Sequence, residues 1–221
     1  TLTPAIHHYD RWVSTPNGRL FTRTWEPDRI RSEVPILLFH DSLGCVDLWR
    51  NFPEALCAAT RQRVIAYDRL GFGRSDASST PLPLSFIDDE ARGNFAAICH
   101  ALQVTRFIAL GHSVGGCMAV HCAGYYFSQC QGLVTIAAQA FNENRTRQGI
   151  EEAKATFQTP EQFAKLVKYH GNKARWVFDA WTDTWLSPEF AAWSLTHALE
   201  RVRCPTLVLH GEKDGIVVEA A

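Results

Sequence analysis

The chain has 221 residues, a formal net charge of −1 and a hydrophobic content of 46%, and aromatic residues make up 11% of the sequence. These values suit one sizeable folded domain and exclude a chain that is disordered throughout. Basic residues form no cluster, and no apolar run approaches the roughly 20 residues that cross a bilayer. We therefore expect a small-molecule substrate, with no nucleic-acid partner and no membrane partner. The sequence defines no oligomeric state.

The seven cysteines are odd in number and form no C-x-x-C pair. Most of them lie in apolar stretches, which favours reduced, buried thiols and a cytoplasmic protein. The first residues lack the basic and apolar segments of a signal peptide. No Cys/His spacing fits a zinc site, so we expect neither a metal nor a cofactor.

The first elements of the sequence predict a β-hairpin and two buried strands. Residues 6–15 and 19–27 flank Pro16-Asn17-Gly18, and Asn-Gly suits the positive φ values of a type I′ turn. Residues 34–39 are continuously apolar, a helical stretch over 47–60 follows, and residues 63–68 are a second predicted buried strand. Continuous apolarity is typical of strands that are covered on both faces, as in a parallel sheet.

The alternation of helices and strands then continues. A helix is predicted over 86–102, with Phe86, Phe95, Ile98 and Leu102 facing inward. Further strands are predicted at 106–111, 132–138 and 204–211, with a helix over 114–126 between the first two. This order predicts an α/β fold with a mostly parallel sheet flanked by helices.

The alternation stops between residues 139 and 203, where the sequence is helical throughout. This segment is far longer than an ordinary connecting loop, so we expect a helical cap insertion over the carboxyl edge of the sheet. The predicted domains are therefore the first part of the core (1–138), the cap (139–203), and a core strand with an acid loop (204–221).

Gly111-His112-Ser113-Val114-Gly115 lies where a predicted strand meets a predicted helix. G-x-S-x-G at such a turn exposes the serine Oγ at the carboxyl end of the strand, and the helix N-terminus favours negative charge. We predict that Ser113 is a nucleophile and that the backbone N–H of Val114 stabilises an oxyanion. The alternative is a glycine-rich turn in which the serine is only a polar filler.

Two further loops follow buried strands. In His40-Asp41-Ser42-Leu43-Gly44 we expect the backbone N–H of Ser42 to be the second oxyanion donor, and His40 to brace the loop. Residues 67–76 contain Gly71-Phe72-Gly73, but the third glycine of a dinucleotide-binding loop is absent. We expect a tight turn there, fixed by Asp68 and Arg69.

The strand at 204–211 leads into Gly-Glu-Lys-Asp. A carboxylate just past a buried strand, downstream of the serine, suits the acid of a triad in the order Ser…Asp…His. Asp214 is therefore the predicted acid, and Glu212 is expected to be a turn residue.

Taken together, these motifs resemble the α/β-hydrolase superfamily from the hairpin to Asp214. "DSLG" and "HGEKD" look like its serine esterase and lactonase branch, which includes enol-lactonases and valacyclovir-hydrolase-like enzymes. The first loop departs from the commoner His-Gly pair by carrying Asp41. The serine argues against haloalkane dehalogenases and epoxide hydrolases, which use an aspartate nucleophile.

The resemblance implies a catalytic histidine after one more strand, but all nine histidines precede Asp214. His112 is expected to point away from its neighbour Ser113. His210 is the best internal substitute, and His170 or His197 could reach the site only by an unusual route. We therefore expect the base beyond residue 221, together with the last strand and helix of the fold, so that the sequence is incomplete at its C-terminus.

The predicted activity is hydrolysis of a small carboxylic ester, thioester or lactone through a Ser113 acyl-enzyme. Phe178, Trp181 and Trp185 share one helical face, where they either pack the cap onto the core or line the substrate pocket. Two alternatives stay open. The same site could carry out C–C bond hydrolysis or cofactor-free haloperoxidation, or the molecule could be a non-catalytic binding protein on this scaffold.

Overall fold

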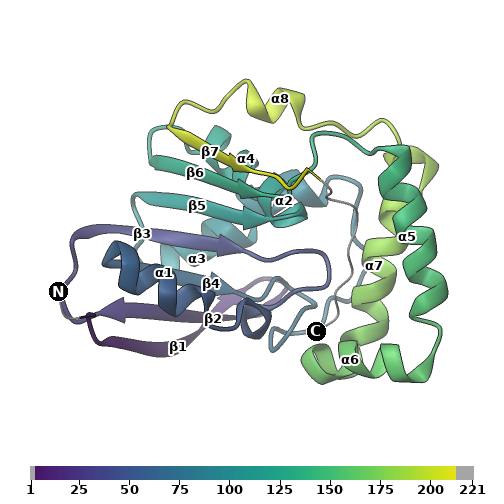
Figure 1. Ribbon diagram of the computed structural model, residues 1–221, viewed down its shortest axis with the longest axis horizontal. Helices are drawn as coiled ribbons and strands as arrows, with labels where there is room; N and C mark the ends of the chain where they lie inside the picture. Colours follow the sequence, from purple (N-terminus) through teal and green to yellow (C-terminus); the bar gives the residue numbers. More distant parts are fainter. Residues whose placement is uncertain (1–2, 213–221) are drawn as a thin grey trace.

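The structure is a computed structural model that describes residues 3–212. Within these residues, seven strands form a sheet of order β1-β2-β4-β3-β5-β6-β7 (Figure 1). The first two strands form an antiparallel hairpin, β2 pairs antiparallel with β4, and every later pairing is parallel. The strands are β1 (Ile6–Thr15), β2 (Gly18–Pro27), β3 (Ser32–Phe39), β4 (Gln62–Tyr67), β5 (Phe107–His112), β6 (Cys130–Ile136) and β7 (Thr206–Leu209).

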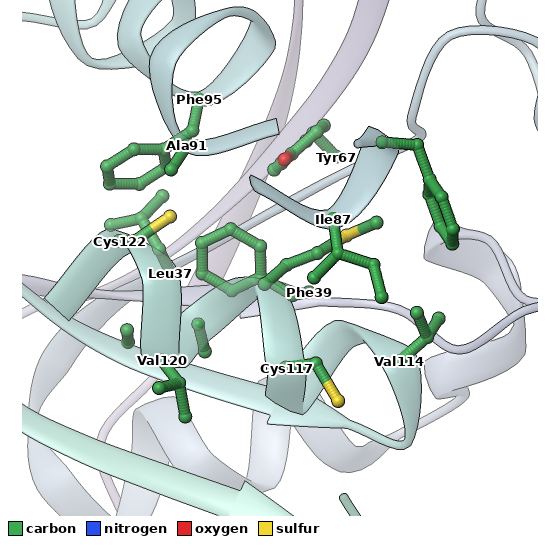
Figure 2. Packing of buried hydrophobic residues seen from close by; sticks show 14 of the residues in the cluster. Leu37, Phe39, Tyr67, Ile87, Ala91, Phe95, Val114, Cys117, Val120 and Cys122 are labelled. Atoms are coloured by element: carbon green, nitrogen blue, oxygen red, sulfur yellow. The ribbon is translucent and has the colours of Figure 1, made fainter. Parts of the chain in front are cut away.

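Helices cover both faces of this sheet. On one face lie α2 (Phe86–Arg92), α3 (Asn94–Ala101) and α4 (Val114–Tyr125), whose apolar side chains form the larger core cluster (Figure 2). On the other face lie the 3₁₀ turn η1 (Val46–Trp49) and α1 (Phe52–Thr60), over a smaller cluster. The mostly parallel α/β fold predicted from the sequence is confirmed.

The central strand β3 shows why continuous apolarity predicts a buried strand. Side chains alternate across a sheet. Leu37 and Phe39 pack into the cluster under α2–α4, whereas Ile36 and Leu38 pack into the cluster under α1. All four side chains are at most 4% exposed. Both faces of the strand must therefore be apolar, which removes the period-two pattern of a half-exposed strand.

The hairpin turn differs from the prediction. Thr15 pairs with Gly18, so Pro16 and Asn17 are the two loop residues. A type I′ turn needs positive φ at both loop residues, and the proline ring fixes φ near −65°. The positive φ, 143°, lies instead at Gly18, the first residue of β2. The predicted type I′ turn is therefore wrong, although the hairpin itself forms.

Two predicted helices are each divided. The stretch at 47–60 forms η1 and then α1, with Pro53 in the first turn of α1. The stretch at 86–102 divides at Gly93, the residue between α2 and α3. The predicted inward residues Phe86, Phe95 and Ile98 are buried, whereas Leu102 is half-buried just after α3.

The segment between β6 and β7 is helical. Figure 1 shows α5, α6 and α7 stacked beyond the carboxyl ends of the parallel strands, and α8 on the return to β7. The elements are α5 (Asn144–Thr156), α6 (Pro160–His170), η2 (Gly171–Lys173), α7 (Ala174–Leu186), η3 (Pro188–Phe190) and α8 (Thr196–Leu199). No helix within residues 3–212 is both long enough and apolar enough to cross a membrane.

Candidate active site

Ser113 lies between the end of β5 and the start of α4, in a backbone conformation that residues other than glycine rarely adopt. Its φ is 54° and its ψ is −124°. Such a conformation costs on the order of 1–3 kcal/mol and persists only where the surroundings enforce it. The Ser113 N–H donates to the Ile136 carbonyl at 2.8 Å, and its own carbonyl accepts from the Gly116 N–H at 2.8 Å. The turn is therefore held from both sides.

The glycines around Ser113 permit contacts that a side chain would block. A Cβ built on Gly111 would lie 2.1 Å from the Gly115 carbonyl oxygen. A Cβ on Gly115 would lie 2.1 Å from the Phe39 carbonyl oxygen and 2.5 Å from that of His40. The first turn of α4 thus packs directly on the end of β3. This contact is the structural requirement behind the G-x-S-x-G spacing.

The first backbone N–H groups of α4 follow Ser113 directly. Val114 is the first residue of this 12-residue helix and is 1% exposed. The first four N–H groups of a helix have no carbonyl partner within it, and the helix dipole adds positive character there. The Val114 N–H therefore belongs to a group of donors suited to an anion, next to the Ser113 hydroxyl.

The loop after β3 (residues 40–45, the β3 loop) carries Ser42, which is half-buried. The Gly44 N–H closes a turn on the Asp41 carbonyl at 3.3 Å. A Cβ on Gly44 would lie 2.0 Å from Asp41 Oδ1, so a larger residue there would require the Asp41 carboxylate to move.

His40 braces the β3 loop, as the sequence predicts. It is 2% exposed, its Nδ1–H donates to the Asp41 carbonyl at 2.8 Å, and its Nε2 accepts from the Arg69 N–H at 3.0 Å. The Arg69 guanidinium donates to the His40 carbonyl at 2.6 Å and to the Asp41 carbonyl at 3.1 Å. Burial, together with the Arg69 charge, lowers the pKa of His40 well below its ordinary value. The ring is therefore neutral and has no nitrogen free for proton transfer.

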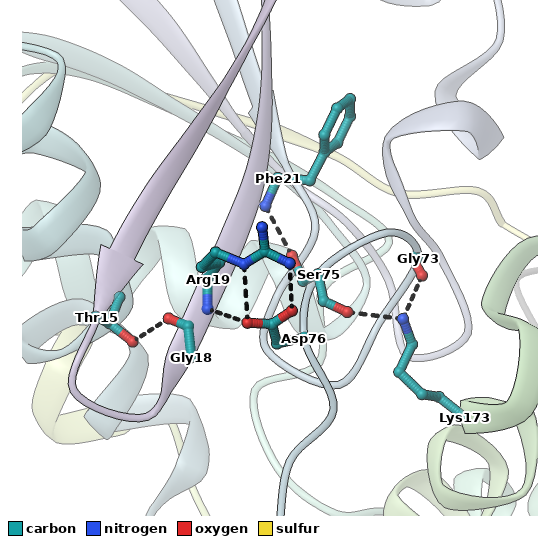
Figure 3. Close-up of polar contacts among 8 residues, drawn as sticks. All are labelled: Thr15, Gly18, Arg19, Phe21, Gly73, Ser75, Asp76 and Lys173. Carbon is teal, nitrogen blue, oxygen red and sulfur yellow. Dashed lines mark hydrogen bonds and ion pairs between the residues drawn. The ribbon is translucent and has the colours of Figure 1, made fainter.

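The loop after β4 (residues 68–76, the β4 loop) forms the tight turn that the sequence predicts. Asp68 Oδ1 accepts from the Val46 N–H at 2.6 Å, and Oδ2 accepts from the Arg74 N–H at 2.8 Å. Burial raises the pKa of Asp68 to about 6. The Ser75 hydroxyl donates to the Asp68 carbonyl at 2.6 Å. It also accepts from the Phe21 N–H at 2.9 Å (Figure 3). These contacts fix the loop to η1 and to β2.

Asp214 lies outside the described residues, and so does any histidine beyond residue 221. Glu212, the last described residue, is exposed and in a turn.

Several of the nine histidines already have partners away from Ser113. His121 pairs with Asp88 at 3.3 Å, and the His197 side chain is 94% exposed beside Glu200. His112 lies edge-on to Trp49, and His210 is exposed after β7. In the part of the molecule that the structure describes, no histidine hydrogen-bonds to Ser113 Oγ. Over the same residues, no group of three or more His, Cys, Asp or Glu side chains is arranged to hold a metal ion.

The three aromatic residues on one face of α7 are buried. Phe178, Trp181 and Trp185 are 4%, 7% and 2% exposed. Phe178 packs on Phe157 at 5.2 Å between ring centroids, and Trp185 packs on Phe190 at 5.0 Å. Phe178 also lies edge-on to Trp181, with 6.0 Å between the ring centroids. All three side chains therefore pack between the helices that follow β6.

The sequence did not predict three contacts that run from the α6–α7 corner to the loops of the core. His170 bridges the β3 loop and the β4 loop, Lys173 donates to two carbonyls of the β4 loop, and the Trp176 ring occupies the space beside Gly71. The partners of His170 lie 97 and 127 residues away in the sequence. No local pattern could have indicated these contacts.

A serine at a strained strand-to-helix turn, two loops at the carboxyl ends of β3 and β4, and helices stacked beyond them have the layout of the α/β-hydrolase fold. The family described as alpha/beta hydrolase fold matches residues 34–167, which is more than half of the sequence. The chain belongs to this family.

Curated relatives and solved structures agree with this assignment. The bovine (Bos taurus) (lyso)-N-acylphosphatidylethanolamine lipase is 30% identical over 132 residues, which cover 59% of this chain and 38% of that protein. The mouse (Mus musculus) serine hydrolase BPHL is 29% identical over 194 residues, which cover 84% of this chain and 65% of that protein. The enol-lactonase from Burkholderia xenovorans LB400 has the same fold, with a TM-score of 0.65 and 17% identity over 91% of this chain and 81% of its own. The chain spans less than half the length of the lipases it matches.

Proposed function

We propose that the protein is a serine hydrolase that cleaves a small carboxylic ester, thioester or lactone, with Ser113 as the nucleophile. The observation that supports this proposal best is the Ser113 backbone, because its φ of 54° is strained for a serine and lies at a turn between a strand and a helix. A nucleophile gains exposure of its Oγ beside the N–H groups at the start of α4.

In the proposed reaction, Ser113 Oγ adds to the substrate carbonyl carbon, and its proton passes to the histidine expected beyond residue 221. Asp214 would orient that histidine and stabilise its cationic form. The backbone N–H groups of Val114 and Ser42 would donate to the carbonyl oxygen as it becomes an oxyanion. Collapse of the tetrahedral intermediate breaks the bond to the leaving alcohol or thiol, which takes the proton. Water then hydrolyses the acyl-enzyme by the same route.

The helices that follow β6 bear on the substrate class in this proposal. Because the cap (139–203) would cover the carboxyl edge of the sheet, a compact substrate suits the site better than a polymer. Phe178, Trp181 and Trp185 would enclose an apolar acyl or ring group if their inner edges face it. Their burial against Phe157 and Phe190 argues that packing is their first role.

The proposal is tested by labelling the full-length protein that contains this sequence with a fluorophosphonate, followed by assays on p-nitrophenyl esters and lactones. We expect one label per molecule, lost in Ser113→Ala, with turnover reduced by roughly 10⁴- to 10⁶-fold. Ser42→Ala is the matched control, because it removes a hydroxyl but keeps the backbone N–H that the proposal uses. Full labelling of Ser113→Ala, or no labelling of the wild-type protein, would overturn the proposal, and the latter result would favour a non-catalytic binding protein.

A further inference from the structure

His170, the last residue of α6, joins three segments that are far apart in the sequence. Its Nδ1 accepts from the Gly73 N–H of the β4 loop at 2.9 Å. Its Nε2 lies 2.8 Å from the Leu43 carbonyl of the β3 loop. The side chain is 2% exposed, and its ring packs edge-on against Phe72 at 5.9 Å. A buried imidazole with a partner on each nitrogen is fixed in position.

These partners also fix the proton on the ring. Because Nδ1 accepts a hydrogen bond, the proton of the neutral ring must lie on Nε2, which donates to the Leu43 carbonyl. Burial lowers the pKa of His170 to about 4, with smaller contributions from the Lys173 and Arg69 charges. His170 therefore stays neutral near pH 7 and does not serve as a general base.

The contact at Leu43 lies next to the proposed oxyanion donor. Leu43 follows Ser42 directly, and the peptide whose N–H is the proposed donor is the one that precedes Ser42 Cα. The remaining braces of the β3 loop, His40 and Arg69, hold the carbonyls of His40 and Asp41 on the other side of Ser42. The described hydrogen bonds thus hold the β3 loop on both sides of Ser42. His170 makes the bond on the Leu43 side.

We propose that His170 is a positioning residue for the hydrolytic reaction, which fixes the β3 loop so that the Ser42 N–H points at the oxyanion formed on Ser113. This inference rests on the proposed function. It makes the helices after β6 part of the catalytic geometry, because a side chain of α6 sets the position of a loop that belongs to the core. It also assigns His170 a role in the rate of the chemical step and none in substrate affinity.

Lys173 provides a matched control from the same corner. Its Nζ donates to the Gly73 carbonyl at 2.5 Å and to the Ser75 carbonyl at 2.7 Å (Figure 3). It therefore ties η2, just before α7, to the β4 loop without a contact to the β3 loop among the bonds described. Lys173→Met should loosen the same corner while it leaves Leu43 and Ser42 in place.

The test compares His170→Gln, His170→Ala and Lys173→Met in the full-length protein, with kcat counted per fluorophosphonate-titrated site so that unfolded molecules do not contribute. We expect both His170 variants to lower kcat on a p-nitrophenyl ester by about 10- to 100-fold, with KM within about threefold, because a displacement near 1 Å costs that much. Lys173→Met should lower Tm and keep kcat within about twofold. Wild-type kcat per site in both His170 variants would overturn this inference and leave the proposed function intact. A wild-type protein without turnover would overturn the proposed function itself.

A second inference comes from two thiols. Cys130, the first residue of β6, has its Sγ 3.8 Å from Sγ of Cys204, which lies two residues before β7. Both thiols are free, Cys130 is 3% exposed and Cys204 is half-buried. The Cys130 thiol donates to the Gly132 carbonyl at 3.2 Å. A disulfide needs about 2.05 Å between its sulfur atoms, so these two must approach each other by about 1.8 Å.

We infer that Cys130 and Cys204 form a reversible disulfide in the presence of a low-molecular-weight disulfide such as oxidised glutathione. The Cys204 thiolate attacks one sulfur of the oxidant and releases one glutathione thiol. Cys130 then loses its proton and attacks Cys204 Sγ, which releases the second. Two protein thiols are oxidised while one glutathione disulfide is reduced to two thiols. Burial raises the pKa of Cys130 to about 12, so the second step should accelerate as pH rises.

This disulfide would join the two ends of the segment that contains α5–α8, because Cys130 lies at the start of β6 and Cys204 lies just before β7. The test is incubation with oxidised glutathione, alkylation under denaturing conditions and peptide mapping, with Cys57→Ser as a control in α1. We expect a Cys130–Cys204 peptide and a Tm higher by about 5–10 °C, both lost in Cys204→Ser and kept in Cys57→Ser. Full alkylation of both cysteines after this treatment would overturn the inference.

Discussion

Gly115→Ala is the substitution that tests most directly why the turn at Ser113 has its sequence. The added Cβ would lie 2.1 Å from the Phe39 carbonyl oxygen, whereas ordinary contacts begin at 3.4 Å. The first turn of α4 and the end of β3 would have to separate by about 1.3 Å, which is the difference between these distances. The atoms that the added Cβ would meet are the backbone carbonyl oxygens of Phe39 and His40, so no side-chain rotation can relieve the contact.

The magnitude follows from two opposing effects. Overpacking of a rigid site costs about 3 kcal/mol or more at its upper end. Alanine in place of glycine within a helix returns up to about 1 kcal/mol. The net loss is about 2 kcal/mol or more, which lowers Tm by about 4–8 °C for a domain of this size. Because the separation also moves the β3 loop away from Ser113, we expect kcat on an ester substrate to fall by about 100-fold.

Gly132→Ala is the matched control for this measurement. Gly132 lies in β6, where an added Cβ would meet Ile108 at 3.6 Å, an ordinary van der Waals distance. Thermal unfolding and ester turnover are measured on both variants of the full-length protein. We expect Gly132→Ala to change Tm by less than about 2 °C and to keep wild-type kcat. If Gly115→Ala behaves in the same way, the close approach of α4 to β3 does not set the geometry of Ser113, and the reasoning is wrong.

Three further predictions concern stability. Ser75→Ala should lower the free energy of unfolding by about 1–3 kcal/mol in urea titrations, because it leaves a buried carbonyl and a buried N–H without partners. Ser78→Ala should change it by less than about 0.5 kcal/mol, because the Ser78 hydroxyl is half-buried and donates only within its own loop, to the Thr80 carbonyl. The contribution of His170 to stability should fall by up to about 3 kcal/mol as pH drops from 6.5 through 4, because the unfolded ring takes up a proton that the folded ring, with its pKa of about 4, does not. It is measured as the difference in pH dependence between the wild-type protein and His170→Gln, because His40 contributes a slope of the same sign and Asp68, with its pKa raised to about 6, a slope of the opposite sign. Trp185→Ala should lower Tm through the lost packing on Phe190; a lower affinity for substrate with an unchanged Tm would instead identify Trp185 as a pocket residue.

Most of the fold could be predicted from local sequence because its strands are apolar runs of the right length between polar turns. The strands at 34–39, 63–68 and 132–138 were predicted within a few residues of β3, β4 and β6. The hairpin turn was not, since the choice between loop types depends on which residue pairs with Thr15. The division at Gly93 was missed because one glycine within an apolar helical pattern is often tolerated.

The candidate site was predictable only in part. Ser113, the brace at His40 and the turn at Asp68 and Arg69 follow from residues close together in the sequence at the ends of strands. His170 resembles any other histidine at a helix end, since nothing near it in the sequence indicates a contact with Leu43 or Gly73. The Asp214 acid and the histidine beyond residue 221 stay predictions.

The sequence by itself determined the class of protein, because an α/β hydrolase needs glycines at fixed positions around the serine and those positions are local. Gly111 and Gly115 are required by contacts that any protein with this turn must make, so their spacing indicates the turn. The tertiary structure alone decided what holds the loops around that turn. Hydrogen bonds from His170 and Lys173 join loops about 100 residues away, and such partners are set by packing of the helices after β6 onto the core, which no local pattern specifies.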